Sequence, residues 1–168
     1  AIIGTIASVN QISYGSKYVF NAGITYSKKS FAIDSTRFAI AYNKNAEYGT
    51  AIIGTIASVN QISYGSEYEF HLGFPTFDIS KIDSSSFMLT NKKSSTSSIS
   101  RICSITSGNQ ISYGDEYEFS NEDIGVLNSS ILDSTHVVIT YPDPDNRQTA
   151  IVGTFSLPAA PGMIMMFE

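Results

Sequence analysis

The chain has 168 residues, of which 42% are hydrophobic and 15% charged, and its 15 acidic and 10 basic side chains give a net charge of −5. This hydrophobic content excludes a disordered chain, and the acidic balance excludes the basic surface that nucleic-acid binding requires. Polarity comes from Ser, Thr, Asn, Gly and Tyr, which favour β-sheets and tight turns over amphipathic helices. We expect no signal peptide and no membrane span, and the single Cys103 allows no internal disulfide.

An internal repeat of about 50 residues dominates the chain. The 16 residues AIIGTIASVNQISYGS at 1–16 recur unchanged at 51–66, which only duplication explains. A degraded copy, SRICSITSGNQISYGD, lies at 100–115, and a fourth start, AIVGTF, lies at 150–155. We therefore divide a β-repeat domain, 1–155, into repeats 1–50, 51–99 and 100–149 and a partial repeat 150–155, followed by a Pro- and Met-rich tail at 156–168.

Each repeat contains four strand-like segments. The segment AIIGTIAS is a continuous, β-branched run, as expected of a strand buried on both faces. QISYGSEYEF, at 61–70, alternates apolar and polar residues around Gly65-Ser66. A short third segment ends at Ile33, Ile82 or Leu132, and the fourth is RFAIAY, SFMLTN or HVVITY. Turn-forming residues separate the segments, and none shows sustained helical periodicity.

The fourth segments share apolar positions in register, which we predict to form the core: Phe38, Phe87 and Val137, then Ile40, Leu89 and Ile139. Four short strands in each repeated unit are typical of a β-propeller blade. We therefore expect an all-β, β-propeller-like array of about three and a half units, with a β-sandwich array or a β-solenoid as alternatives. The frame starts and ends within a unit. It fits a four-bladed ring closed by a mixed-terminus blade, a larger ring of two chains, or part of a longer array.

Three aspartates fall in register, each before a Ser-Thr or Ser-Ser pair: Asp34, Asp83 and Asp133. In a propeller, equivalent positions form a ring, so these carboxylates are candidates for a cation or general acid–base site. The simpler interpretation is favoured: each carboxylate accepts a hydrogen bond from a backbone N–H two residues on and stabilises a tight turn.

Recurring tyrosines are the candidate ligand-binding residues: Tyr14, Tyr64 and Tyr113 follow Ile-Ser, and Tyr18, Tyr68 and Tyr117 come four positions later. Alternation places them on one strand face, where they either join the core or form an aromatic surface for carbohydrate. The other candidates favour structural roles. Asp143-Pro144-Asp145-Asn146 lacks the further ligands of a calcium loop, and His71 and His136 have no second metal ligand at a useful spacing. We therefore expect no catalytic residues, cofactor or metal, and thus no enzyme.

The run from Phe38 to Phe70 resembles a repeat of large virion proteins of marine phages and of some bacterial surface proteins. That repeat reads approximately KVVIAYxDxxNSxYGTAIVGTVSGxxISFGxxVVF, preceded by YISxxxDS. The matching stretches are Ala39–Tyr42, Tyr48–Thr55 and Ile62–Gly65, then Val138–Tyr141 and Ala150–Thr154. The second copy departs from it, with Asn91 in place of Tyr and no Tyr-Gly-Thr within 92–98. The resemblance implies propeller-like blades and brings no catalytic motif.

These observations predict a non-catalytic structural or adhesive module of a virion appendage or an extracellular or cell-surface assembly. Its expected partners are other copies of itself or neighbouring subunits, and not nucleic acid. The alternatives are a glycan-binding, lectin-like propeller and, further off, a glycoside-hydrolase-like scaffold. A lectin needs one pocket per blade, whereas an enzyme needs one asymmetric pocket with shifted carboxylate pKa values.

Overall fold

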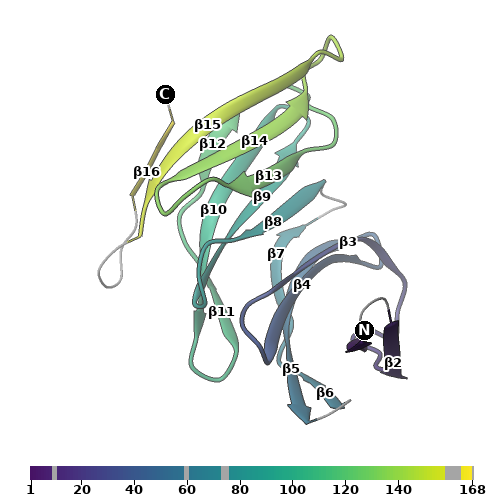
Figure 1. Ribbon diagram of the computed structural model, residues 1–168. Coiled ribbons are helices and arrows are strands. Elements are labelled where there is room, and N and C mark those ends of the chain that lie inside the picture. Colours follow the sequence, from purple (N-terminus) through teal and green to yellow (C-terminus); the bar gives the residue numbers. More distant parts are fainter. Residues whose placement is uncertain (9–10, 59–60, 73–75, 158–163, 168) are drawn as a thin grey trace.

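The computed structural model describes residues 1–8, 11–58, 61–72, 76–157 and 164–167, and these form sixteen strands with no helix (Figure 1). All pairings between these strands are antiparallel. The fold class predicted from the sequence, all-β, is therefore confirmed. The strands divide into one hairpin and three larger sheets.

Successive strands of the chain pair with each other within each sheet, except that the last strand of the first sheet and of the second sheet pairs with the strand two before it. The N-terminal hairpin consists of β1 (Ile2–Ser8) and β2 (Gln11–Lys17). The first sheet contains β3 (Thr25–Ala32), β4 (Arg37–Lys44), β5 (Tyr48–Ser58), β6 (Gln61–Tyr64) and β7 (Tyr68–Leu72). The second contains β8 (Phe77–Lys81), β9 (Ser86–Ser94), β10 (Ser97–Thr106), β11 (Gln110–Tyr113) and β12 (Tyr117–Ser120). The third contains β13 (Asn128–Ile131), β14 (His136–Pro142), β15 (Gln148–Ser156) and β16 (Ile164–Phe167).

The segment QISYGSEYEF, which the sequence presents as one strand, is two strands in the structure. Both β6 and β7 pair with the long β5, with Tyr64 opposite Gly54 and Tyr68 opposite Ala51. Four steps along one side therefore match three along the other, which is the geometry of a β-bulge. The bulge begins at Gly65, whose N–H still donates to the Ile53 carbonyl at 2.9 Å. Strands β11 and β12 lie against β10 in the same way.

The third sheet is completed by the C-terminal tail, which the sequence analysis left outside the repeats. Strand β16 pairs with β15 and places Phe167 opposite Gly153, just as Tyr64 lies opposite Gly54 in the first sheet. The tail therefore takes the position of a β6-type strand. Its two prolines, Pro158 and Pro161, lie outside the described residues.

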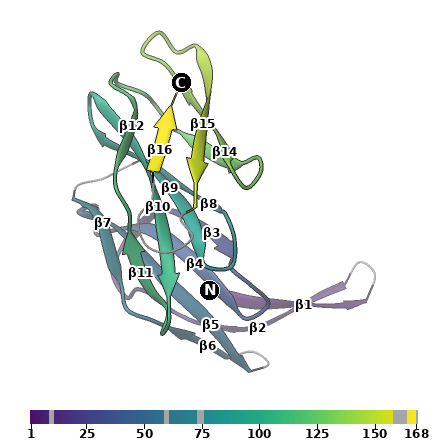
Figure 2. The ribbon, with the colours of Figure 1, turned by 90° about the vertical axis from the view of Figure 1, so that its left-hand side faces the viewer.

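The three sheets stack face to face, with the second between the other two and the hairpin at the opposite end from the third sheet (Figures 1 and 2). Their first strands lie side by side, β3 against β8 and β8 against β13. Of the core positions that the sequence predicted, Phe87, Leu89, Val137, Ile139 and Ile40 are buried, and Phe38, at the end of the stack, is half-buried.

The stacking has a direction, because each sheet uses two different faces. We call the face that carries Ala39 and Ile53 in the first sheet the forward face, and the face that carries Phe38 and Ile40 the rear face. The first sheet's forward face packs on the second sheet's rear face, around Phe87. The equivalent forward residues of the second sheet, Met88 and Ile102, pack on the rear face of the third. Both interfaces thus join a forward face to a rear face.

Candidate interaction surfaces

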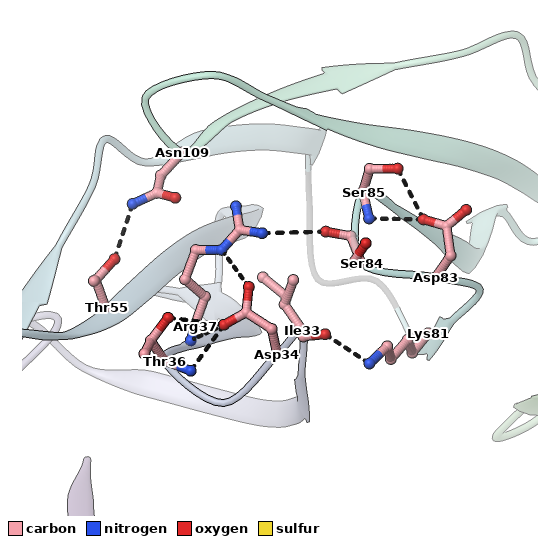
Figure 3. A network of polar contacts seen from close by, with 10 residues as sticks. All are labelled: Ile33, Asp34, Thr36, Arg37, Thr55, Lys81, Asp83, Ser84, Ser85 and Asn109. Carbon is pink, nitrogen blue, oxygen red and sulfur yellow. Dashed lines mark hydrogen bonds and ion pairs between the residues drawn. The ribbon is translucent and has the colours of Figure 1, made fainter.

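The aspartates in register each organise one tight turn after the first strand of a sheet. Figure 3 shows the turns of Asp34 and Asp83. The Oδ1 atom of Asp34 accepts hydrogen bonds from the Thr36 N–H at 2.8 Å and from the Arg37 N–H at 2.8 Å. Asp83 and Asp133 accept the same kind of bond from the N–H two residues on, at 2.6 and 2.7 Å. Each carboxylate is therefore engaged locally and has the geometry of a turn-stabilising aspartate.

Hydrogen bonding also sets the charge state of these carboxylates. The backbone N–H of Thr36, followed by the Arg37 guanidinium, holds the pKa of Asp34 well below its usual range. The Thr135 N–H and the His136 side chain lower the pKa of Asp133 to about 2. General acid–base catalysis near neutral pH requires shifts in the opposite direction. Among the residues that the structure describes, no three His, Cys, Asp or Glu side chains gather as a metal site.

The recurring tyrosines link neighbouring units instead of forming one surface. The Tyr113 hydroxyl donates to the Tyr68 carbonyl at 2.8 Å, and the Tyr64 hydroxyl donates to the Tyr18 carbonyl at 3.3 Å. Burial raises the pKa of both Tyr113 and Tyr64. Tyr14 is 66% exposed, whereas the other members of the set are half-buried: Tyr18, Tyr64, Tyr68, Tyr113 and Tyr117.

Polar contacts that the sequence analysis missed join the adjacent first strands of the three sheets. Asp78 on β8 accepts a hydrogen bond from the Ser129 N–H on β13 at 2.7 Å and pairs with Lys29 on β3 at 3.3 Å. Ser80 donates to the Ser129 carbonyl at 2.8 Å. The only signal for them in the sequence is Asp78 within a short strand, because an aspartate is unfavourable there unless it has a partner.

A second contact missed from the sequence is an ion pair that recurs in the first two sheets. Lys44, at the end of β4, pairs with Glu67 in the bulge between β6 and β7. Lys93 pairs with Glu116 at 2.5 Å in the equivalent place, where Glu116 also binds Arg101. The sequence did contain a signal for this ion pair, because a lysine and a glutamate recur at the same two positions in both copies of the repeat.

The third sheet exposes its forward face. Val152 is 50% exposed, although Ile53 and Ile102, at the equivalent positions, are 0% and 1% exposed. Leu132 is 57% exposed, whereas its equivalent Ile33 is fully buried. The exposure follows from the stack, because among the described residues no fourth sheet covers this face.

The rear face of the first sheet is only partly covered. Phe20 packs edge-on against Tyr42, with ring centroids 5.0 Å apart. Beside it, a cavity of about 460 Å³ opens between β1 and the sheet, lined by Phe38, Ile40 and Ile56. The hairpin itself exposes Ile6 at 79% and Ile12 at 57%. Both ends of the stack therefore expose apolar side chains.

The other candidates have structural roles. Burial raises the pKa of the Cys103 thiol, which is fully buried and so does not suit a nucleophile. Asp143 accepts bonds from the N–H groups of Asp145 at 3.0 Å and Arg147 at 2.8 Å, which is turn geometry. His136 bonds Asp133, and His71 is half-buried, with its pKa lowered mainly by burial.

Comparison with family models, with curated proteins and with solved structures finds no match to this chain. None of the described residues belongs to a helix long and apolar enough to cross a membrane.

Proposed function

We propose that this chain is a non-catalytic structural or adhesive module of a virion appendage or an extracellular or cell-surface assembly, and that it acts through protein–protein contacts at the ends of its sheet stack. The same proposal includes a propeller-like arrangement, with each four-stranded unit as one blade. The resemblance of the repeat to virion and bacterial surface proteins supports the setting.

One observation carries the proposal: apolar positions that are buried inside the stack are exposed at its end, as Val152 is compared with Ile53 and Ile102. Exposing such a face to water is unfavourable, and covering it contributes roughly 25 cal/mol per Å² of apolar area. Two such ends on one molecule favour an assembly module over an isolated domain. The carboxylates do not favour catalysis, because those of Asp34 and Asp133 are held in tight turns.

Light scattering across a range of protein concentrations tests this function. We expect an average mass that rises with concentration, together with no binding on a glycan array and no hydrolysis of model glycosides. A constant monomer mass accompanied by saturable glycan binding that Tyr14→Ala abolishes contradicts the proposal and favours the lectin-like alternative.

A further inference from the structure

We propose that the third sheet of one molecule and the N-terminal segment of a second copy of this chain join into one composite sheet, in which β2 of the second molecule exchanges its partner β1 for β15 of the first and takes the place that β16 holds there. This inference rests on the proposed function, since it names the partner in that contact. In the composite sheet, the exposed forward face of the third sheet covers the partly covered rear face of the first sheet, in the place that β1 leaves.

The exchange preserves strand register. Strand β1 places Gly4 opposite Tyr14 and Thr5 opposite Ser13 of β2. In the same way, β15 places Gly153, the equivalent of Gly4, opposite Phe167 of β16. The two strands carry nearly the same sequence, AIIGTI and AIVGTF. Because the ladder is formed by backbone groups, β2 accepts either strand, and with β15 it places Thr154 opposite Ser13, in the place of Met166 of β16.

The exchange also pairs the part of the β15 edge that β16 leaves open. Strands β5 and β10 each pair with two successive segments, β6 and β7 or β11 and β12. Within the described residues β15 pairs on this side with β16 alone, beginning at Gly153, so its first half, Gln148–Val152, has an open edge. Residues 18–20 follow β2 as β7 follows β6 and supply the missing segment.

The apolar surfaces match in the same arrangement. Phe87 and Leu89 on the rear face of the second sheet are each 1% exposed, since the first sheet covers them, with Phe31 and Phe87 ring centroids 5.5 Å apart. Their equivalents on the first sheet, Phe38 and Ile40, line the cavity of about 460 Å³. In the composite sheet β13 and β14 lie over that cavity, and Val152 becomes buried as Ile53 is.

Charge supplies an independent argument. Both complete sheets join a lysine at the end of their second strand to a glutamate in the bulge, Lys44 to Glu67 and Lys93 to Glu116. At the ends of the chain both signs are reversed: Asp143 stands at the position of Lys44, and Lys17 at that of Glu67. Residue 17 is also the first difference after the identical 16-residue run. The composite sheet brings Lys17 and Asp143 together and so keeps an attractive pair. A glutamate at residue 17 would repel Asp143, and a lysine at residue 143 would repel Lys17.

The contact joins two different surfaces of the same chain, so it is heterologous and generates a ring or a filament. The hairpin and the third sheet lie at opposite ends of the stack (Figure 1), which is why the partner is a second molecule.

Disulfide trapping tests the register directly. Ser13→Cys and Thr154→Cys are made as separate proteins, mixed, and oxidised gently; directly opposed strand residues are close enough for a disulfide. The native Cys103 is fully buried and does not compete. We expect a disulfide-linked heterodimer, and at least about fivefold less with Ser63→Cys in place of Ser13→Cys. Ser63 is the matched control because it occupies the same place in the repeat but lies in β6, within the five-stranded first sheet, whereas β2 pairs with β1 alone among the described residues.

Association constants from sedimentation test the face and the ion pair. Val152→Asp, at an exposed site, should weaken association at least about tenfold, because a carboxylate enters an apolar contact. Lys17→Glu should weaken it about two- to fivefold, because a glutamate then faces Asp143. Leu72→Asp, an equally exposed change away from both end faces, should have no effect.

The outcomes separate the inference from the proposed function. The composite sheet is overturned if Val152→Asp still associates and if Ser13→Cys and Thr154→Cys form no disulfide. The chain would then be a module that acts through other protein contacts. A disulfide that forms only within one chain carrying both cysteines also overturns it, because the molecule then closes on itself. A chain that stays monomeric at every concentration contradicts the self-assembly on which both rest.

Discussion

At the scale of single residues, tyrosine hydroxyls donate some of the hydrogen bonds between successive units. Tyr113 is the better placed, since its hydroxyl lies 2.8 Å from the Tyr68 carbonyl and is partly buried. We expect Tyr113→Phe to lower the free energy of unfolding by about 1 kcal/mol, because it leaves a carbonyl without its donor. Urea denaturation measures the difference. Tyr14→Phe, in an identical QISYG context, is the control and should change nothing measurable, since Tyr14 is 66% exposed.

The turn at Asp133 predicts a dependence of stability on pH. Its pKa is about 2 in the folded chain, against an ordinary value of 3.8, chiefly because the Thr135 N–H and the His136 side chain bond the ionised form. The carboxylate therefore contributes stability above about pH 4, and this contribution is lost as the pH falls through 2. Asp133→Asn should lower the thermal midpoint at pH 7 and reduce its fall between pH 4 and pH 2.

His136→Gln serves as the control for this turn. It removes the imidazole and keeps both backbone donors to Asp133, from Thr135 and His136. Most of the acid dependence should remain, because the Thr135 N–H has the largest effect on the pKa. If His136→Gln removes as much of the slope as Asp133→Asn does, the side-chain pair and not the turn is responsible.

At the scale of elements, the duplicated strand lies in two different environments. In β5, a side chain at Gly54 would overlap the ring of Phe38, which lies directly opposite on β4. In β1, a Cβ on the equivalent Gly4 would meet the Tyr14 ring at 3.2 Å, and no β4-type strand lies beside it among the described residues. We expect Gly54→Ala to cost roughly 1–3 kcal/mol and Gly4→Ala much less. Equal losses in urea denaturation would show that Phe38 does not restrict the site.

The elements also show what the sequence was able to predict. The strands and the core positions were predictable, because period-two patterns repeat at a fixed offset and shared apolar positions such as Phe87 and Leu89 follow from them. Strand β16 was not predictable, because nothing in the tail resembles QISY. Its register is seen only in its pairing with β15 in the structure. The turn role of the aspartates was favoured from local spacing alone. The contact of Asp78 with Ser129 joins strands that are 51 residues apart, beyond any local pattern.

The same limit applies to the end faces. Val152 and Ile53 occupy equivalent positions in equivalent strands, and their local sequences give no reason for different exposure. The difference arises from the order of the sheets in the stack, which places one strand inside and the other at an end. A surface of this kind is a property of the whole array.

At the scale of the whole molecule, stacking makes the second sheet the most protected part. It is covered on both faces, and Cys103 within it is fully buried against the first sheet. We expect a thiol reagent to label Cys103 only when the stack opens, with a urea midpoint equal to that of global unfolding. Amide exchange should be slowest in β9 and β10 and fastest in the hairpin, whose Ile6 is 79% exposed. A Cys103→Ser chain carrying Ser13→Cys provides the control and should react at once under native conditions. Rapid labelling of Cys103 in the folded protein would instead mean that the first and second sheets separate easily, and then the stack would be too weak to present two rigid ends to a neighbour.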